Sequence, residues 1–342
     1  EKNKGKKRKL EQTKENKMGV MPVNKLLVTM SLPIVISMLI QAMYNLVDSV
    51  FVAQINPDAL TAVGMAFPMQ SLMIAFQTGL GVGMNALVSR YLGQKKPYEA
   101  GLAATHALIL TALNYVIFLI VGLTAIPAFF SIQTHSEIIA GYGVEYLSIV
   151  CCGSLGLFFQ IYGERILQAT GKTLLSMVSQ ILGAVINIVL DPVFIFGVDF
   201  LGIPAMGVTG AAIATVIGQI IAAAVGFLLH HFHNKELRLV FRKFRLNLGT
   251  IKTIYAVGIP SIIMSALVSV LTFGMNIILK AYEPAAATVF GVYFKLQSFV
   301  YMPVFGMNNG IVPIIAYNYG AGKPTPETAK RAVRPNSPTP RA

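Results

Sequence analysis

Long apolar runs alternate with short polar stretches along most of the chain. A helix needs about 20 apolar residues to cross about 30 Å of hydrocarbon, and eight runs reach that length. They cover about residues 26–54, 60–89, 100–127, 138–161, 172–198, 207–231, 253–281 and 286–318. Membrane-spanning strands are shorter and alternate between apolar and polar residues, which these runs do not. The pattern predicts an all-α integral membrane protein with about eight transmembrane helices.

One segment of the chain occurs twice. Residues 33–97 align without a gap to residues 260–324, 227 positions later. Because apolar stretches resemble one another by composition, the signal comes from matched Pro, Gly and Gln-Ser positions. These include Pro33 and Pro260, Gly79 and Gly306, Gly93 and Gly320, and Gln70-Ser71 and Gln297-Ser298. An internal repeat in a membrane protein indicates a transporter built from two similar halves with a binding site between them.

The repeat divides the chain into two unequal lobes. Residues 26–232 hold six predicted spans and form a complete N-terminal lobe, whereas residues 253–320 hold only the first two helices of a C-terminal lobe. Polar segments flank the lobes at residues 1–25, 233–252 and 321–342. A second copy as long as the first would continue to about residue 458, about 116 residues beyond Ala342. We therefore expect the chain to be truncated at its C-terminal end.

Basic residues lie almost entirely on one side of the predicted spans. Of 27 Lys and Arg, 25 precede the first span or follow an even-numbered one, including Arg165 after the fourth; Lys280 and Lys295 fall elsewhere. The positive-inside rule places that side, and the N-terminus, in the cytoplasm of a multi-pass plasma-membrane protein. The basic N-terminal segment, the basic inter-lobe linker and the polar tail are then cytoplasmic. Because six spans separate the two copies, they are parallel repeats related by an axis along the membrane normal.

Composition and charge narrow the classes of function. Mean hydropathy is +0.66 and charged residues make up 12 %, against about one quarter in soluble domains. The net charge of +13 owes much to Lys2–Lys17, which has no aromatic residue to stack a base. We interpret this segment as a solvated tail near anionic membrane lipid, and we expect no nucleic-acid partner. Residues 320–324 lack the spacing of a phosphate loop, and no hydrolase pattern occurs, so we expect no enzyme activity and no cofactor.

Two carboxylates lie inside apolar runs. Asp48 falls in the first and Asp191 in the fifth. A carboxylate in the membrane costs several kcal/mol unless it faces a cavity and finds a partner, which makes each a functional candidate. Tyr44 and Asn45 precede Asp48 by four and three residues, and Asn187 precedes Asp191 by four. Residues at these spacings share a helix face, so each helix presents an oxygen-rich patch.

The same region offers further oxygen ligands. Pro192 cannot donate to the carbonyl of Ile188, which leaves that carbonyl free, and Thr209 adds a hydroxyl at the start of the sixth run. Asp48, Asp191 and Thr209 all fall in the outer half of the N-terminal lobe. Such oxygens suit a hard monovalent cation, and a desolvated carboxylate also accepts H⁺. The simpler alternative is that both acids only tie helices together through hydrogen bonds.

Several short motifs resemble those of the multidrug and toxic compound extrusion (MATE) family of secondary transporters, over about residues 20–323. They are Ser31-Leu32-Pro33, Tyr44-Asn45-x-x-Asp48, Arg90-Tyr91-Leu92-Gly93, Ile166-Leu167-Gln168-Ala169-Thr170-Gly171, Asn187-x-x-x-Asp191-Pro192 and Gly207-x-Thr209-Gly210-Ala211-Ala212. Each motif alone is weak, whereas the set is specific. The resemblance implies twelve spans in two six-helix lobes, and a monomer when the protein is full length.

The resemblance also implies a mechanism. Family members exchange inward Na⁺ or H⁺ for the export of lipophilic, usually cationic compounds. One branch binds its coupling cation in the N-terminal lobe, and its motif residues match Asp48, Asn187, Asp191 and Thr209, which become candidate Na⁺ ligands. Another branch uses an acid in the seventh span, and residues 253–279 contain none. The first branch is therefore favoured.

The sequence leaves open the roles of two polar residues in the eighth run and two alternatives to the leading function. Lys295 and Gln297 are candidates for the substrate pathway, although Lys295 could equally extend outward to the membrane surface. The leading hypothesis is a cation-coupled multidrug antiporter, or an inactive fragment of one. A flippase for lipid-linked saccharides is the alternative from the wider superfamily, but those line the cavity with several Arg. A truncated, non-transporting membrane protein is the alternative from another class.

Overall fold

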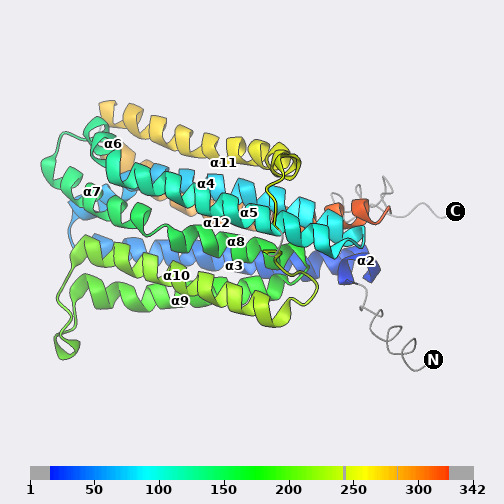
Figure 1. The fold of residues 1–342 in the computed structure, drawn as a ribbon. Helices are drawn as coiled ribbons and strands as arrows, with labels where there is room; N and C mark the ends of the chain where they lie inside the picture. The colour runs from blue at the N-terminus through cyan, green and yellow to red at the C-terminus, as the bar shows by residue number, and fades with distance from the viewer. Residues whose placement is uncertain (1–15, 242–243, 283, 323–342) are drawn as a thin grey trace, which may run out of the picture.

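The computed structural model describes residues 16–241, 244–282 and 284–322, and that part of the chain is almost entirely helical (Figure 1). The helices are α2 (Lys17–Val20), α3 (Val23–Ala53), α4 (Pro57–Gly93), α5 (Pro97–Thr124), α6 (Ile126–Gln133), α7 (Glu137–Cys152), α8 (Leu155–Ala169), α9 (Thr173–Phe196), α10 (Gly207–His233), α11 (Leu248–Tyr282) and α12 (Pro284–Gly320), with a 3₁₀ helix η1 (Asp199–Leu201). Local signals fix several starts: the Asn56 side chain accepts the amide of Ala59 at 2.6 Å, and Pro57 occupies the first turn of α4.

The predicted number of spans is confirmed. Within the described residues, seven single helices are long and apolar enough to cross a membrane, and the bent pair α7–α8 makes eight. The two helices of that pair meet at 47°, because the helix breaks at Gly153 and Ser154. A Cβ on Gly153 would lie 2.5 Å from a methyl group of Val216, so glycine lets α10 pack closely at the break.

Arg165 was expected to follow the fourth span, and this expectation was wrong. Helix α8 continues to Ala169 and buries Arg165 at 5 % exposure. Its guanidinium Nη1 donates to Gln168 Oε1 at 3.2 Å, and Gln168 Nε2 donates in turn to Ser176 Oγ at 3.1 Å. The apolar run ends near residue 161 because the last turns of α8 carry polar side chains, which this hydrogen-bonded chain satisfies inside the bundle.

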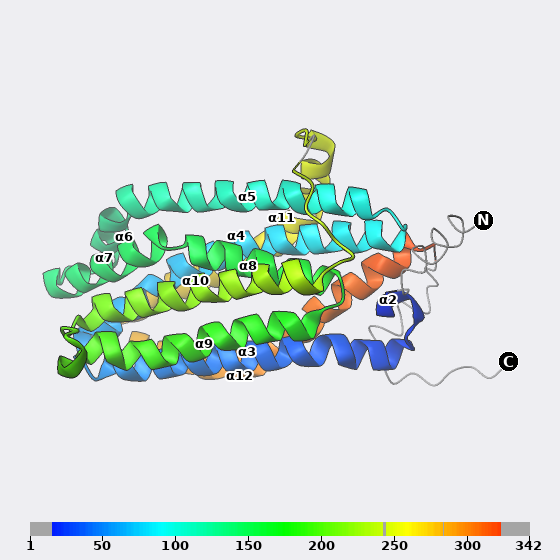
Figure 2. The same ribbon diagram turned by 60° about the horizontal axis from the view of Figure 1, so that its bottom comes forward.

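The helices run roughly along one axis. Helix α11 lies along α4 (Figure 1), and α12 lies along α3 (Figure 2). Helix α9 packs against both α3 and α10. We call the end with Lys96, Lys172 and Lys252 the basic end, and the opposite end, with Asp58 and Glu137, the acidic end. Helix α3 therefore packs on α9 within the N-terminal lobe and on α12 of the second copy of the repeat.

The two copies of the repeat pack on each other through equivalent contacts. A Cβ on Gly93 would lie 2.0 Å from the Tyr317 carbonyl oxygen, and a Cβ on Gly320 would lie 2.1 Å from the Arg90 carbonyl oxygen. Gly93 and Gly320 are 227 positions apart in the sequence, as are Arg90 and Tyr317. The same contact is therefore made twice with the roles of α4 and α12 exchanged, as a parallel repeat requires.

Segments outside the long helices dock against the basic end. Met18 of α2 is 1 % exposed, and its carbonyl accepts Asn318 Nδ2 at 3.2 Å. Burial lowers the pKa of the neighbouring Lys17 ammonium, because it disfavours the charged form. The linker between α10 and α11 lies on α5, where Thr105 Oγ1 accepts the amide of Val240 at 2.9 Å. The predicted polar linker is thus hydrogen-bonded to the N-terminal lobe.

Candidate functional site

The two acids inside the membrane helices are neighbours in space. Asp48 lies five residues before the end of α3 and Asp191 five before the end of α9, so both sit about 7–8 Å from the acidic end of their helices. Helix α3 packs against α9, so the two acids lie at the same depth on adjacent helices. The structure therefore brings together the two carboxylates that the sequence singled out.

Asp191 is held from its own helix. Its side chain is 0 % exposed, and Asn187, one turn earlier, is 3 % exposed. Asn187 Nδ2 donates to Asp191 Oδ1 at 3.2 Å and reaches Thr215 Oγ1 of α10 at 3.4 Å. Helix α9 continues through Pro192 to Phe196, so the proline stays inside the helix. The predicted helical patch of Asn187 and Asp191 is present, and α10 supplies a hydroxyl beside it.

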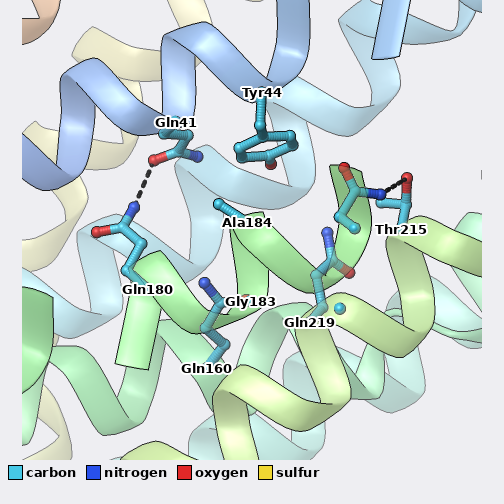
Figure 3. Close-up of a pocket in the computed structure, with 10 residues that line it drawn as sticks. Gln41, Tyr44, Gln160, Gln180, Gly183, Ala184, Thr215 and Gln219 are labelled. Atoms are coloured by element: carbon cyan, nitrogen blue, oxygen red, sulfur yellow. Dashed lines mark hydrogen bonds between the residues drawn. The ribbon is translucent and has the colours of Figure 1, made fainter. Parts of the chain in front are cut away.

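A small polar cavity adjoins this pair. Figure 3 shows amide side chains from four helices around it, with Tyr44 from α3 at its rim. It is lined by Gln41, Tyr44, Gln160, Gln180, Gly183, Ala184, Asn187, Thr215, Gly218 and Gln219. Its volume of about 30 Å³ matches one water molecule or one bare monovalent cation. Drug-sized ligands fill about 300–1,000 Å³, so the cavity cannot hold one.

Three oxygens in this region lack hydrogen bonds. Among the described residues, Asn187 Oδ1, Asp191 Oδ2 and Gln219 Oε1 are buried and accept no hydrogen bond within the protein. A buried acceptor left unsatisfied costs about 1–3 kcal/mol, and more when it is charged. A cation, or a proton on the carboxylate, would remove that cost. One carboxylate and two amide oxygens are ligands that suit a hard cation such as Na⁺.

Thr209 and Asn45 lie differently from the other predicted residues. Thr209 Oγ1 forms a short hydrogen bond with Glu145 of α7, an exposed acid near the acidic end. The hydroxyl that contacts Asn187 belongs instead to Thr215, six residues further along α10. Asn45 is on the exposed side of α3. A role of Thr209 and Asn45 in cation binding stays a prediction. The same holds for Tyr44, Asp48, Asn187 and Asp191.

The sequence patterns did not single out the glutamine side chains that line the cavity, or Glu164, which bonds to one of them. Gln180 Nε2 donates to Gln41 Oε1 at 2.8 Å and so links α9 to α3. Gln160 Nε2 donates to Glu164 Oε1 at 3.0 Å, which places a third carboxylate inside the lobe. Single Gln residues within apolar runs were the available signal, but their common cavity depends on how the helices pack.

The candidates on α12 are only partly described. The side chain of Lys295 lies outside the described residues, and Gln297 is half-buried. Among the side chains that the structure describes, no three His, Cys, Asp or Glu come together to hold a metal ion. A cation at Asp48 and Asp191 would therefore depend on amide and hydroxyl oxygens as well as carboxylates.

Known proteins resemble this chain over both copies of the repeat. The family model MatE matches residues 33–193 and 260–334, beginning in each copy at the proline that opens the repeat. Multidrug export protein MepA of Staphylococcus haemolyticus is 27% identical over 296 residues, which cover 86% of this chain and 64% of that protein. An FAD transporter of Shewanella oneidensis is 27% identical over 313 residues, covering 91% of this chain and 68% of the relative.

Solved structures share the fold. A MOP superfamily transporter from Pyrococcus furiosus superposes with a TM-score of 0.84 at 28% identity, covering 94% of this chain and 70% of that one. A multidrug resistance MATE family transporter in an outward-facing conformation gives the same values, 0.84 and 28%. The chain spans about two thirds of the length of these relatives, from 64% to 70%.

Proposed function

The chain belongs to the MatE family, and from this membership we propose that it takes part in cation-coupled export of small organic molecules across a membrane. One observation carries the proposal: Asp48 and Asp191 lie at the same depth on adjacent helices, each one turn from a residue, Tyr44 or Asn187, that lines a cavity of water size. Two acids so placed repel each other when both are ionised, and a bound cation or proton removes that repulsion. The site is therefore suited to respond to the driving ion rather than to hold the cargo.

We propose that Asp48, Asn187 and Asp191 bind the coupling ion, Na⁺ or H⁺. Asp191 Oδ2 and Asn187 Oδ1, which accept no hydrogen bond within the described protein, would contact it. Helix α10 offers two hydroxyl ligands, the predicted Thr209 and Thr215. Thr215 is the alternative to Thr209, because its Oγ1 already accepts a hydrogen bond from Asn187. When the ion binds, the carboxylates of α3 and α9 can approach, and when it leaves they repel.

Helix α3 would carry that change to the rest of the protein. It carries Asp48, packs against α9, and packs along α12, which belongs to the second copy of the repeat. A shift of α3 against α9 therefore alters the contact between the two copies, where the cargo of such transporters binds. Coupling of this kind is reciprocal, so the cargo must lower the affinity for the ion by the same factor as the ion lowers that for the cargo.

The proposed cargo is a small lipophilic cation. Relatives named as multidrug export proteins support this class, and the family resemblance implies it. The relative named as an FAD transporter offers an anionic cargo as the competing class. We also propose that the basic end faces the cytoplasm of a plasma-membrane protein, because its loops carry the Lys and Arg.

Flux through proteoliposomes tests these proposals. The chain would be reconstituted with ethidium or FAD inside, under a Na⁺ gradient at constant pH or a pH gradient without Na⁺. We expect ethidium efflux that follows one gradient and is lost in Asp191→Asn. Movement of FAD alone would overturn the cargo class. Movement of a fluorescent lipid-linked saccharide without either gradient would favour the flippase. No flux from a folded, inserted chain would favour a non-transporting role.

A further inference from the structure

The repeat creates two equivalent positions at the basic end. In the first, Met18 of α2 is buried in an apolar cluster. Five residues of the long helices surround Met18 in this cluster, namely Leu26, Met30, Leu92, Ile314 and Tyr317, and Met21 after α2 also packs against it. The same offset of 227 positions, extended to the residues just before position 33, turns these five residues into Thr253, Val257, Tyr319, Leu87 and Arg90. All five line a second cavity of about 300 Å³ between α4, α11 and α12.

The first position shows what such a site takes up. Met18 is 1 % exposed, and Leu26 and Met30 beneath it are 1 % and 0 % exposed. A Cβ on Gly19 would lie 3.0 Å from the Tyr317 ring, so α2 sits directly on that side chain. An apolar group entering from the basic end therefore fills the first position completely.

The second position is not filled by the equivalent segment of the chain. Residues 244–247 correspond to α2, and Arg245 takes the place of Met18. This segment docks on α5 instead, where the Phe244 ring lies 4.7 Å from the His106 ring. The amide of Asn247 donates to His106 Nε2 at 2.9 Å. Among the described residues, the counterpart of α2 is therefore bound to α5 and does not enter the cavity between α4, α11 and α12.

The second position also differs in chemistry. Its inner walls are apolar, with Ala86, Leu87, Val257, Val312, Ile315 and Ala316. At its outer end the Arg90 guanidinium lies 5.3 Å from the centre of the Tyr319 ring. The first position has Tyr317 where the second has Arg90, so only the second position carries a positive charge here. An occupant needs an apolar body and an anionic end.

We propose that this cavity binds an anionic phospholipid, with part of an acyl chain against Val257 and Ala316 and the phosphate on Arg90. From Tyr319 to Val312 the cavity follows α12 for seven residues, about 10 Å down from the helix end. The headgroup would then lie at the membrane surface and the chain in the hydrocarbon. The basic loops around this end attract anionic lipid, which raises its local concentration.

The inference does not depend on transport. Purified chain in detergent would be mixed with equal amounts of phosphatidylglycerol and phosphatidylcholine of identical acyl chains, and retained lipid would be counted by native mass spectrometry. We expect one phosphatidylglycerol per chain, preferred about tenfold, as a charge-assisted contact implies. Arg90→Gln should remove the preference, and Ala316→Trp should remove both lipids by filling the cavity. Lys96→Gln, at the same end, and Leu113→Trp, on the exposed face of α5, should change neither.

Three results would overturn the proposal. They are equal retention of both lipids by the unaltered chain, an unchanged preference in Arg90→Gln, and full displacement of phosphatidylglycerol by millimolar inorganic phosphate, which would show a plain anion site. Ala316→Trp could fail to fold, so photoactivatable phosphatidylglycerol in vesicles provides a second test on the unaltered chain. Cross-links should fall on peptides of α4, α11 or α12 around the cavity. Cross-links spread over the exposed face of α5 would contradict a specific site.

Discussion

The two copies of the repeat share their packing but differ in their chemistry. Helices α3 and α11 correspond, yet Asp48 of α3 has Met275 as its counterpart, Tyr44 has Leu271, and Gln41 has Val268. The glycine contacts between copies are kept on both sides, as the paired contacts of Gly93 and Gly320 show. The repeat therefore gives α3 and α11 equivalent packing, while a few substitutions leave an acid and its polar neighbours on α3 only.

The largest effect on transport is expected from removing the charges of Asp48 and Asp191. Asp48→Asn and Asp191→Asn keep the size of each side chain but remove its charge, so each should abolish gradient-driven efflux of ethidium from proteoliposomes. Met275→Asn, at the counterpart of Asp48, should leave the efflux close to that of the unaltered chain. Coupled efflux in both Asp variants would show that these acids are not the coupling site, and its loss in Met275→Asn would show that α11 takes part in coupling.

The shared packing can be broken on either side. Gly93→Ala and Gly320→Ala each place a Cβ about 2 Å from a backbone oxygen, so each should destabilise the protein by about 1–3 kcal/mol. Thermal unfolding in detergent would measure both, and we expect similar losses because the contacts are equivalent. Gly64→Ala, where a Cβ meets nothing within 4 Å, should be neutral or stabilising. A loss for only one of the pair would contradict the symmetry of the packing.

A finer comparison separates the two threonines of α10. Asn187→Ala and Thr215→Ala remove neutral oxygens next to Asp191, so each should weaken cation binding several-fold, as about 1 kcal/mol implies. Thr209→Ala breaks the bond to Glu145 and should change cation affinity less than Thr215→Ala does. Calorimetric titration with Na⁺ would rank the three. A larger loss in Thr209→Ala would restore the ligand set predicted from the sequence.

The smallest effect concerns the linker between α10 and α11, which is bound to α5. Thr105→Val removes the acceptor for the amide of Val240 and should cost about 1 kcal/mol, with faster proteolysis of the linker. Thr124→Val is a matched control, because its hydroxyl donates only to Ile120 of the same helix and is exposed. Equal proteolysis of the two variants would mean that the bond to Thr105 does not hold the linker.

The sequence predicted the spans and the repeat because both depend on properties visible along the chain, namely apolar length and matched Pro and Gly positions. It missed the break at Gly153 and the burial of Arg165, because a polar turn of a buried helix reads like a loop until its partners, here Gln168 and Ser176, are known. The two acids stood out as charges within apolar runs.

The remainder of the site depends on helix rotation and pairing. Gln160, Gln180 and Gln219 lie on three helices, and a common cavity appears only once α8, α9 and α10 are packed. Thr209 and Thr215 both lie on α10, and only the register of α10 against α9 decides which hydroxyl faces Asn187. A single sequence contains neither quantity.

Direct ion binding tests the central claim, that the N-terminal lobe holds the coupling site through Asp48 and Asp191. Na⁺ would be titrated into purified chain at pH 8, and proton release on adding ethidium would be recorded in the same preparation. We predict either one bound Na⁺ per chain or proton release, and the loss of both in the double variant Asp48→Asn, Asp191→Asn. An unchanged Na⁺ stoichiometry together with unchanged proton release in that double variant would contradict the account.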